Sequence, residues 1–172
     1  MPRHPAEGSA DAGFARDMST HHAQAVSLAT DEYRATSDGE LRQISVDIAL
    51  TQQAQIGMMQ AWLQTWGLPA SSKDKPMAWM PGGESELKDG LMPGMATNAE
   101  REKLRAASGR EKDVLFCQLM IQHHLGGIHM IDAVLAQGEN HDVRELAQTM
   151  KDGQQYEITV LQKKLKELGA EP

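Results

Sequence analysis

The sequence predicts an all-α protein, a four-helix bundle made of two tandem helical hairpins with a long crossover between the second and third helices. Three observations predict this fold. Apolar residues recur at helical spacing in four segments of about 25 residues each. Residues 11–67 return as residues 113–169 at a constant shift of 102 positions. Proline and glycine interrupt the helical pattern between the two copies.

The first copy is expected to form the first hairpin. Residues 1–10 are polar and rich in alanine, proline and glycine, so we expect a disordered lead. The pattern then predicts two helices joined by a short turn. They cover residues 11–36, with Asp11 as N-cap, and residues 40–66, which end before Gly67.

The second copy repeats this pattern after the crossover, with helices expected over residues 113–137 and 143–168. Within the crossover, residues 98–107 are expected to form a short helix, with Thr97 as its cap and Glu100 at the capping-box position. We expect a single bundle domain over 11–169, divided into repeat one, 11–67, a connector, 68–112, and repeat two, 113–169.

Composition excludes several classes of function. The net charge is −7 and no basic block occurs, so nucleic acid and anionic membrane surfaces are poor partners. No apolar run reaches the length of a membrane span. Cys117 is the one cysteine, so the chain forms no internal disulfide.

Polar residues occupy positions in the middle of each helix where the apolar stripe is expected to continue. In an antiparallel hairpin, residues equally far from the turn lie at the same height. Packing two such hairpins by their apolar faces would therefore bring these residues into one mid-bundle layer. The expected layer contains His21, His22, Gln52, Gln55, His123, His124, Gln154 and Glu157, with Met18 and Met120 one turn away.

A buried polar group without a partner costs about 1–3 kcal/mol, so this layer needs hydrogen bonds, water or a ligand. One hypothesis is a bound metal ion with the histidines as ligands. Histidine with thioether suits copper, and histidine with carboxylate suits zinc, iron or manganese. A ferritin-type di-iron site is disfavoured, because no Glu-x-x-His pair occurs at these positions.

Three further features leave alternatives open. Gly126 and Gly127 follow the second histidine pair and indicate either a close helix contact or room for a ligand. The Met-x-x-Met pairs of the connector, at Met77 and Met92, suit either Cu(I) or an apolar plug. Cys117 suits either a soft metal site or simple burial.

Several motifs together resemble the family known as domain of unknown function 305. They are F-x3-M-x2-HH at Phe14 and Phe116, W-L-x2-W-G at Trp62–Gly67, M-P-G-M at Met92–Met95 and Q-x2-E-I at Gln154–Ile158. The resemblance covers about residues 11–169. It implies a ferritin-like four-helix bundle that is commonly exported and, in some members, linked to copper.

The resemblance also implies a set of metal candidates in each copy. They are Asp11, Met18, His21 and His22 in the first copy and Asp113, Met120, His123, His124 and Glu157 in the second. The first copy departs from the family pattern at Gln55, which replaces an acid, and at Leu28, which replaces a methionine.

We therefore expect a secreted or extracytoplasmic metal-binding protein, with copper favoured over zinc, iron or manganese, and we identify no protein partner. The alternatives are an enzyme with a His/Glu site and a structural or partner-binding bundle whose polar layer fixes helix register.

Overall fold

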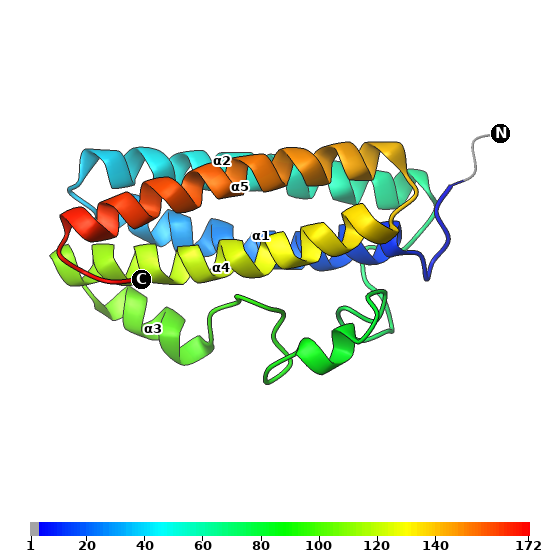
Figure 1. Cartoon of the computed structure of the whole chain (residues 1–172), viewed down its shortest axis with the longest axis horizontal. Helices are drawn as coiled ribbons and strands as arrows, with labels where there is room; N and C mark the ends of the chain where they lie inside the picture. The colour runs from blue at the N-terminus through cyan, green and yellow to red at the C-terminus, as the bar shows by residue number, and fades with distance from the viewer. Residues whose placement is uncertain (1–3) are drawn as a thin grey trace.

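A computed structural model describes residues 4–172, which form four long helices, one short helix and one 3-10 turn (Figure 1). The helices are α1 (Ala10–Ala35), α2 (Gly39–Thr65), α3 (Asn98–Ala106), α4 (Gly109–Gln137) and α5 (His141–Glu167), and the 3-10 turn is η1 (Gly83–Glu86). The all-α prediction is confirmed. Residues 1–3 of the lead expected to be disordered lie outside the described residues.

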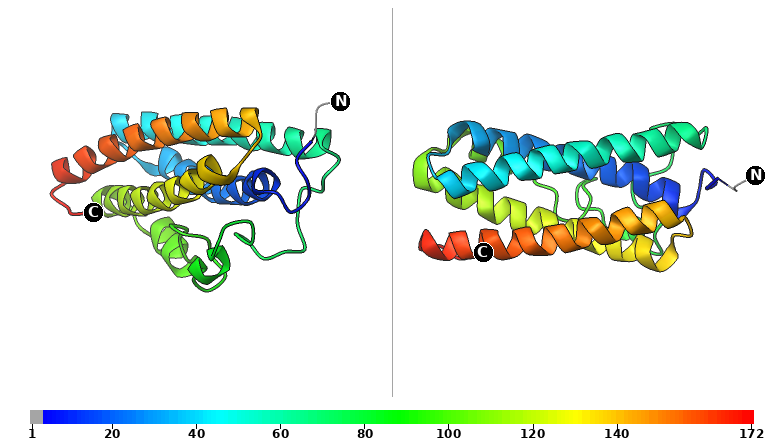
Figure 2. Two further views of the ribbon diagram at one scale, coloured as in Figure 1. Left: turned by 45° about the vertical axis from the view of Figure 1, so that its right-hand side comes forward. Right: turned by 90° about the horizontal axis from the view of Figure 1, so that it is seen from above.

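The four long helices form two antiparallel hairpins in two layers. α1 packs against α2, α4 packs against α5, and the hairpins meet through α1 and α4. α2 and α5 make up the other layer (Figure 2). The connector, with η1 and α3, crosses the outer face of α1 and α4, on the side opposite α2 and α5 (Figure 1).

Short polar side chains cap the N-termini of α1, α2, α3 and α5. Asp38 caps α2 by accepting a hydrogen bond from the Leu41 amide at 2.9 Å, and Asn140, its equivalent in the second copy, caps α5. Thr97 and Glu100 form the expected capping box of α3. The N-cap of α1 is Ser9, so the assignment of this role to Asp11 was wrong.

The hydrophobic core is divided into two clusters, one at each end of the bundle. Phe14 belongs to the cluster near the α4–α5 turn, and Phe116, its repeat equivalent, belongs to the cluster near the α1–α2 turn. Met77, Met80 and Met92 of the connector are buried in the first cluster, which favours the apolar-plug interpretation of these residues. Between the clusters lies the polar layer.

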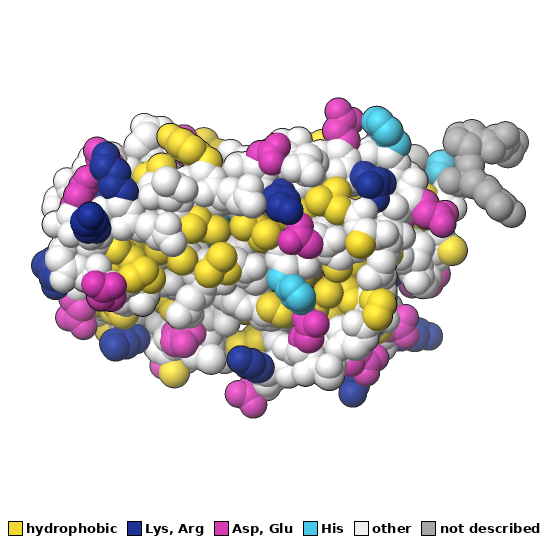
Figure 3. All heavy atoms as spheres, viewed as in Figure 1, with side chains coloured by type: hydrophobic (Ala, Val, Ile, Leu, Met, Phe, Trp, Pro, Cys, Tyr) yellow, Lys and Arg dark blue, Asp and Glu magenta, His cyan; other side chains and the backbone are white. Residues whose placement is uncertain are grey.

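Both signs of charge are mixed on the face of the molecule that Figure 3 shows. On the face in Figure 3, acidic and basic side chains alternate with small apolar areas, and neither sign gathers into a block. Within residues 4–172 no helix is both long and apolar enough to span a lipid bilayer.

Candidate metal centre

The expected mid-bundle layer is present and almost completely shielded from solvent. Each of its four histidines is at most 1 % exposed, and the three glutamines Gln52, Gln55 and Gln154 are also buried. Glu157 is the exception, with a side chain that is 18 % exposed. Polar side chains from all four long helices thus meet between two apolar clusters.

Both copies build the same contact within this layer. The Nε2 atom of His22 lies 2.7 Å from Oε1 of Gln55, and the Nε2 atom of His124 contacts Oε2 of Glu157, in each case across a separation of 33 residues. An amide oxygen and a carboxylate only accept, so Nε2 carries the proton and donates in both pairs. In the neutral form of each imidazole, the lone pair is then on Nδ1.

These Nδ1 atoms have no hydrogen-bond partner. The Nδ1 atoms of His22 and His124 are buried and unpaired, and the same is true of Nε2 of His123 and Oε1 of Gln52. Such unpaired buried polar atoms are uncommon and indicate a missing ligand, ion or water. Three imidazoles and one amide of the same layer thus each have one polar atom without a hydrogen bond.

The other two histidines face each other. The rings of His21 and His123 lie 3.9 Å apart between centroids, with an angle of 38° between their planes. The Nε2 atom of His21 donates to the carbonyl oxygen of Pro93 in the connector at 2.9 Å. The connector supplies no such acceptor to His123, whose Nε2 atom has no hydrogen-bond partner.

The two glycines after His124 serve close packing. A Cβ atom on Gly126 would lie 2.0 Å from the carbonyl oxygen of Pro93, and one on Gly127 would lie 2.9 Å from Oε1 of Gln154 and 3.3 Å from Cε1 of His21. Gly126 therefore lets the connector approach the backbone of α4. Gly127 lets the His21 ring and Gln154 fill the layer.

Burial keeps the imidazoles of His21, His22 and His123 neutral. Loss of solvation lowers the pKa of His21 to about 4 and that of His22 to about 3, although the contacts with Pro93 and Gln55 oppose the shift. Burial, and then the neighbouring histidines, also lower the pKa of His123 well below its ordinary value. Neutral imidazole is the form that binds metal ions.

One thioether lies on each side of the layer. Met18 and Met120 are fully buried, and they belong to the two different apolar clusters. Each precedes a histidine pair by three and four residues, a spacing that places the side chains on one helix face. The layer therefore combines neutral imidazoles with flanking soft sulfur atoms.

Residues 11–165 match the family described as a domain of unknown function, DUF305. The chain belongs to the DUF305 family. It is 43% identical to a candidate secreted DUF305 protein from Streptomyces coelicolor, with 96% of this chain and 98% of that chain covered and a TM-score of 0.88. A DUF305 fragment from Deinococcus radiodurans is 28% identical, with 95% of this chain and 99% of that chain covered and a TM-score of 0.78.

Solved structures of CopM have the same fold at lower identity. CopM in the Cu(I)-bound form is 21% identical, with 91% of this chain and 96% of that chain covered and a TM-score of 0.69. For the Cu(II)-bound form, the identity is 23% and the TM-score 0.72. No curated protein sequence matches this chain.

The two aspartates implied by the DUF305 resemblance do not reach the histidine layer. Each precedes a histidine pair by ten residues, or about 15 Å along a helix. Oδ2 of Asp11 accepts hydrogen bonds from the amides of Glu139 and Asn140, at 3.0 and 3.2 Å, and so ties α1 to the α4–α5 turn. Asp113 lies beside the buried Glu32.

Cys117 is also unsuited to bind a metal ion in the folded protein. Its side chain is buried, and burial, followed by the charges of Glu32 and Asp113, raises the pKa of the thiol to about 12. The sulfur is therefore protonated at neutral pH, whereas metal ions bind the thiolate.

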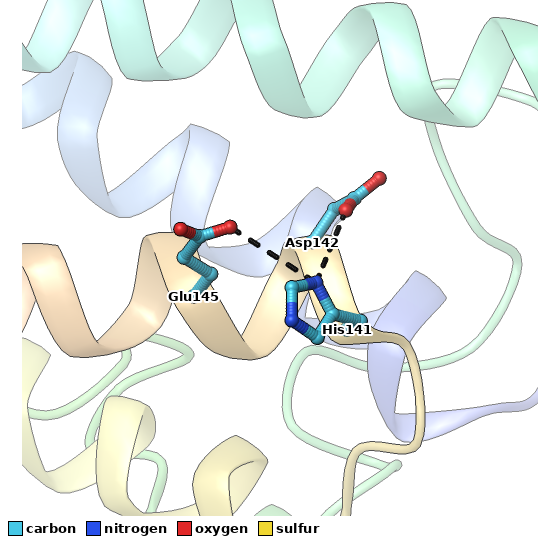
Figure 4. A group of neighbouring side chains, drawn as sticks. All are labelled: His141, Asp142 and Glu145. Atoms are coloured by element: carbon cyan, nitrogen blue, oxygen red, sulfur yellow. Dashed lines mark hydrogen bonds and ion pairs between the residues drawn. The ribbon is translucent and has the colours of Figure 1, made fainter.

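A second group of side chains of the types that bind metal ions lies on the surface, and this group was not predicted from the sequence. Among the described residues, His141, Asp142 and Glu145 are the one group of three whose imidazole and carboxylate ligand atoms lie within 4.8 Å of one another (Figure 4). Their spacing in the first turn of α5 is the sequence signal. Their side chains are 86 %, 71 % and 73 % exposed, and the positive end of the helix dipole disfavours a cation there.

The distances between ligand atoms also limit which ions the buried layer can bind. No three imidazole, carboxylate or thiolate ligand atoms of the described core lie within 4.8 Å of one another. A four-coordinate structural zinc site is therefore not preformed there. An ion in the layer would need thioether ligands or fewer than three of these nitrogen ligands. Copper accepts such a ligand set.

Proposed function

We propose that this DUF305 protein is a non-catalytic metal-binding protein that holds a copper ion in its histidine layer. The observation that carries the proposal is the set of buried nitrogen atoms without partners, Nδ1 of His22, Nδ1 of His124 and Nε2 of His123. Each unpaired buried acceptor costs about 1–3 kcal/mol. A cation bound by two of these atoms, together with a thioether, would remove that cost at both nitrogens.

The hydrogen bonds of the opposite ring nitrogens support this proposal. Metal-binding histidines commonly donate their other N–H to a carboxylate or a carbonyl group, which fixes the tautomer and the ring orientation. His124 contacts Glu157 in this way, and His22 has the same contact with Gln55. Both imidazoles therefore have an oriented Nδ1 lone pair.

Ligand softness and charge favour Cu(I) among the possible ions. Met18 and Met120 supply thioethers, which are soft ligands. Glu157 is the one carboxylate in the layer, so it offsets a single positive charge. A divalent ion would leave uncompensated charge in a buried site, which is costly. The Cu(I)-, Cu(II)- and Ag-bound forms of CopM support copper over zinc, iron and manganese, and the softness and charge of the layer favour Cu(I) over Cu(II).

We also propose that the protein works outside the cytoplasm. The support is its 43% identity to the candidate secreted protein of S. coelicolor.

Competitive titration of the apo protein with Cu(I) against a chromophoric chelator tests the metal proposal. We expect a dissociation constant below about 1 μM for the wild type. The double variant His123→Ala, His124→Ala should lose this binding. His141→Ala, a surface histidine from the second group, should keep it. Equal binding by the double variant, or loss in His141→Ala, contradicts the proposal.

One observation favours a structural role for the layer as a second candidate. In the His22–Gln55 and His124–Glu157 contacts, protein side chains alone provide partners for Nε2 of both imidazoles. If the layer only fixes helix register, replacing all four histidines by leucine should raise the free energy of unfolding. Under the metal proposal, the same variant loses Cu(I) binding and the stabilisation that bound Cu(I) provides.

A further inference from the structure

A groove between α2 and α5 reaches the histidine layer from the side opposite the connector. Its volume is about 140 Å³. It opens between two helices that do not pack as a pair, since α2 packs on α1 and α5 packs on α4. The right-hand view of Figure 2, from above, shows the two helices apart. The groove is lined by Thr51, Gln52, Gln55, Thr149, Met150, Gly153, Gln154 and Glu157.

The sequence repeat builds this groove from equivalent positions. Most of its lining consists of repeat partners that face each other across it. These partners are Thr51 with Gly153, Gln52 with Gln154, and Gln55 with Glu157. The two sides therefore carry the residues that contact the histidines, and the groove leads directly to the polar layer.

The other sides of the layer are closed by packed chain. On the connector side, the Pro93 carbonyl oxygen is bonded to His21. The backbone is also tightly packed there, because a Cβ on Gly94 would lie 2.3 Å from the carbonyl oxygen of Gln122. Two helix pairs close the flanks, and the apolar clusters close both ends. Among the described residues of the layer, Glu157 is the most exposed to solvent.

We propose that this groove is the path by which a monovalent soft cation, Cu(I) or Ag(I), enters and leaves the layer. This inference rests on the proposed function. The Glu157 carboxylate attracts the ion at the mouth of the groove and stands in contact with His124. Oε1 of Gln52 is buried and unpaired on the groove wall, so it can replace a water molecule lost by the ion.

Gly153 keeps the mouth of the groove open. A Cβ atom at this position meets no atom within 4 Å, so a large side chain can be added without distorting the helix. Gly57 has the same free space, but it lies outside the groove. The pair Gly153→Trp and Gly57→Trp therefore compares the same substitution on and off the proposed path.

The test is stopped-flow loading of the apo protein with Ag(I), followed by an equilibrium titration of each variant. We expect Gly153→Trp to load and release Ag(I) at least about tenfold more slowly than the wild type, with its affinity nearly unchanged. Gly57→Trp should behave as the wild type. Thr51→Trp, on the α2 side of the groove, should give the same result as Gly153→Trp on the α5 side. Agreement between the two variants excludes a local effect of one substitution.

The outcomes separate the two proposals. Wild-type loading rates in both Gly153→Trp and Thr51→Trp, with affinity intact, overturn the access path and leave the proposed function standing. Absence of Ag(I) and Cu(I) binding in the wild type overturns both.

Discussion

The Nε2 atom of His21 donates a hydrogen bond to the carbonyl oxygen of Pro93 at 2.9 Å, which joins the connector to the middle of α1. His123 occupies the equivalent position in the second copy, and its Nε2 atom has no partner. The connector therefore breaks the symmetry of two otherwise similar hairpins. It leaves His123 as an imidazole with a free ring nitrogen in the layer.

Gly126 is expected to be essential for this contact. A Cβ on Gly126 would lie 2.0 Å from the Pro93 carbonyl oxygen, so Gly126→Ala should displace the connector and lower the free energy of unfolding by about 1–3 kcal/mol. Gly57→Ala, where the added carbon meets open space, should instead raise it by up to about 1 kcal/mol. Urea unfolding measures both. Equal effects of the two variants would contradict the close-packing interpretation.

The sequence predicted the fold and the composition of the layer well. Helical periodicity and the repeat determine which residues face inward, and the equal arms of each hairpin determine their height. Neither determines a side-chain contact. Membership of the layer does not show which glutamine His22 contacts, and the partner is Gln55 rather than Gln52. The bond between His21 and Pro93 could not be predicted, because the connector has no periodic pattern.

The aspartates show a different limit of sequence reasoning. Asp11 was assigned to a helix cap and to the metal set, but its hydrogen bonds join it to a turn 128 residues away. Only the packed hairpins create that contact. Glu32, where the second copy has Val134, was not singled out, because a single acid in a helix gives no sign of burial.

Glu157 should control the affinity of the layer through its charge. In Glu157→Gln, the amide oxygen can still accept from His124, as Gln55 does for His22, so the fold should be unchanged. We expect Cu(I) affinity to fall by about 10–100-fold. The same competition titration measures this change. The reciprocal variant, Gln55→Glu, should increase the affinity, and an unchanged affinity in Glu157→Gln would argue against a charge-compensated site.

Glu32 should make stability depend on pH. Burial, followed by the neighbouring Asp113 carboxyl, raises the pKa of Glu32 from 4.5 to about 9. The folded chain therefore holds a proton that the unfolded chain releases above its ordinary pKa. The contribution of this group to stability is largest below about pH 4.5 and is lost as the pH rises through about 9.

Glu32→Gln removes this titration and keeps an N–H donor next to Asp113. Between about pH 5.5 and 8.5, the decrease in its free energy of unfolding should be smaller than the decrease for the wild type, by at least about 1 kcal/mol. Urea unfolding at the two pH values measures the difference. Glu145→Gln, an exposed control, should keep the wild-type slope. A wild-type slope in Glu32→Gln would mean that Glu32 is not the group responsible.

The most direct measurement is an anomalous difference map from crystals of the protein loaded with Ag(I). We expect the strongest peak inside the bundle, bonded to Nδ1 of His124 and to at least one further histidine, with a methionine sulfur nearby. A buried layer filled only by water, with silver confined to His141 or other surface groups, would contradict it.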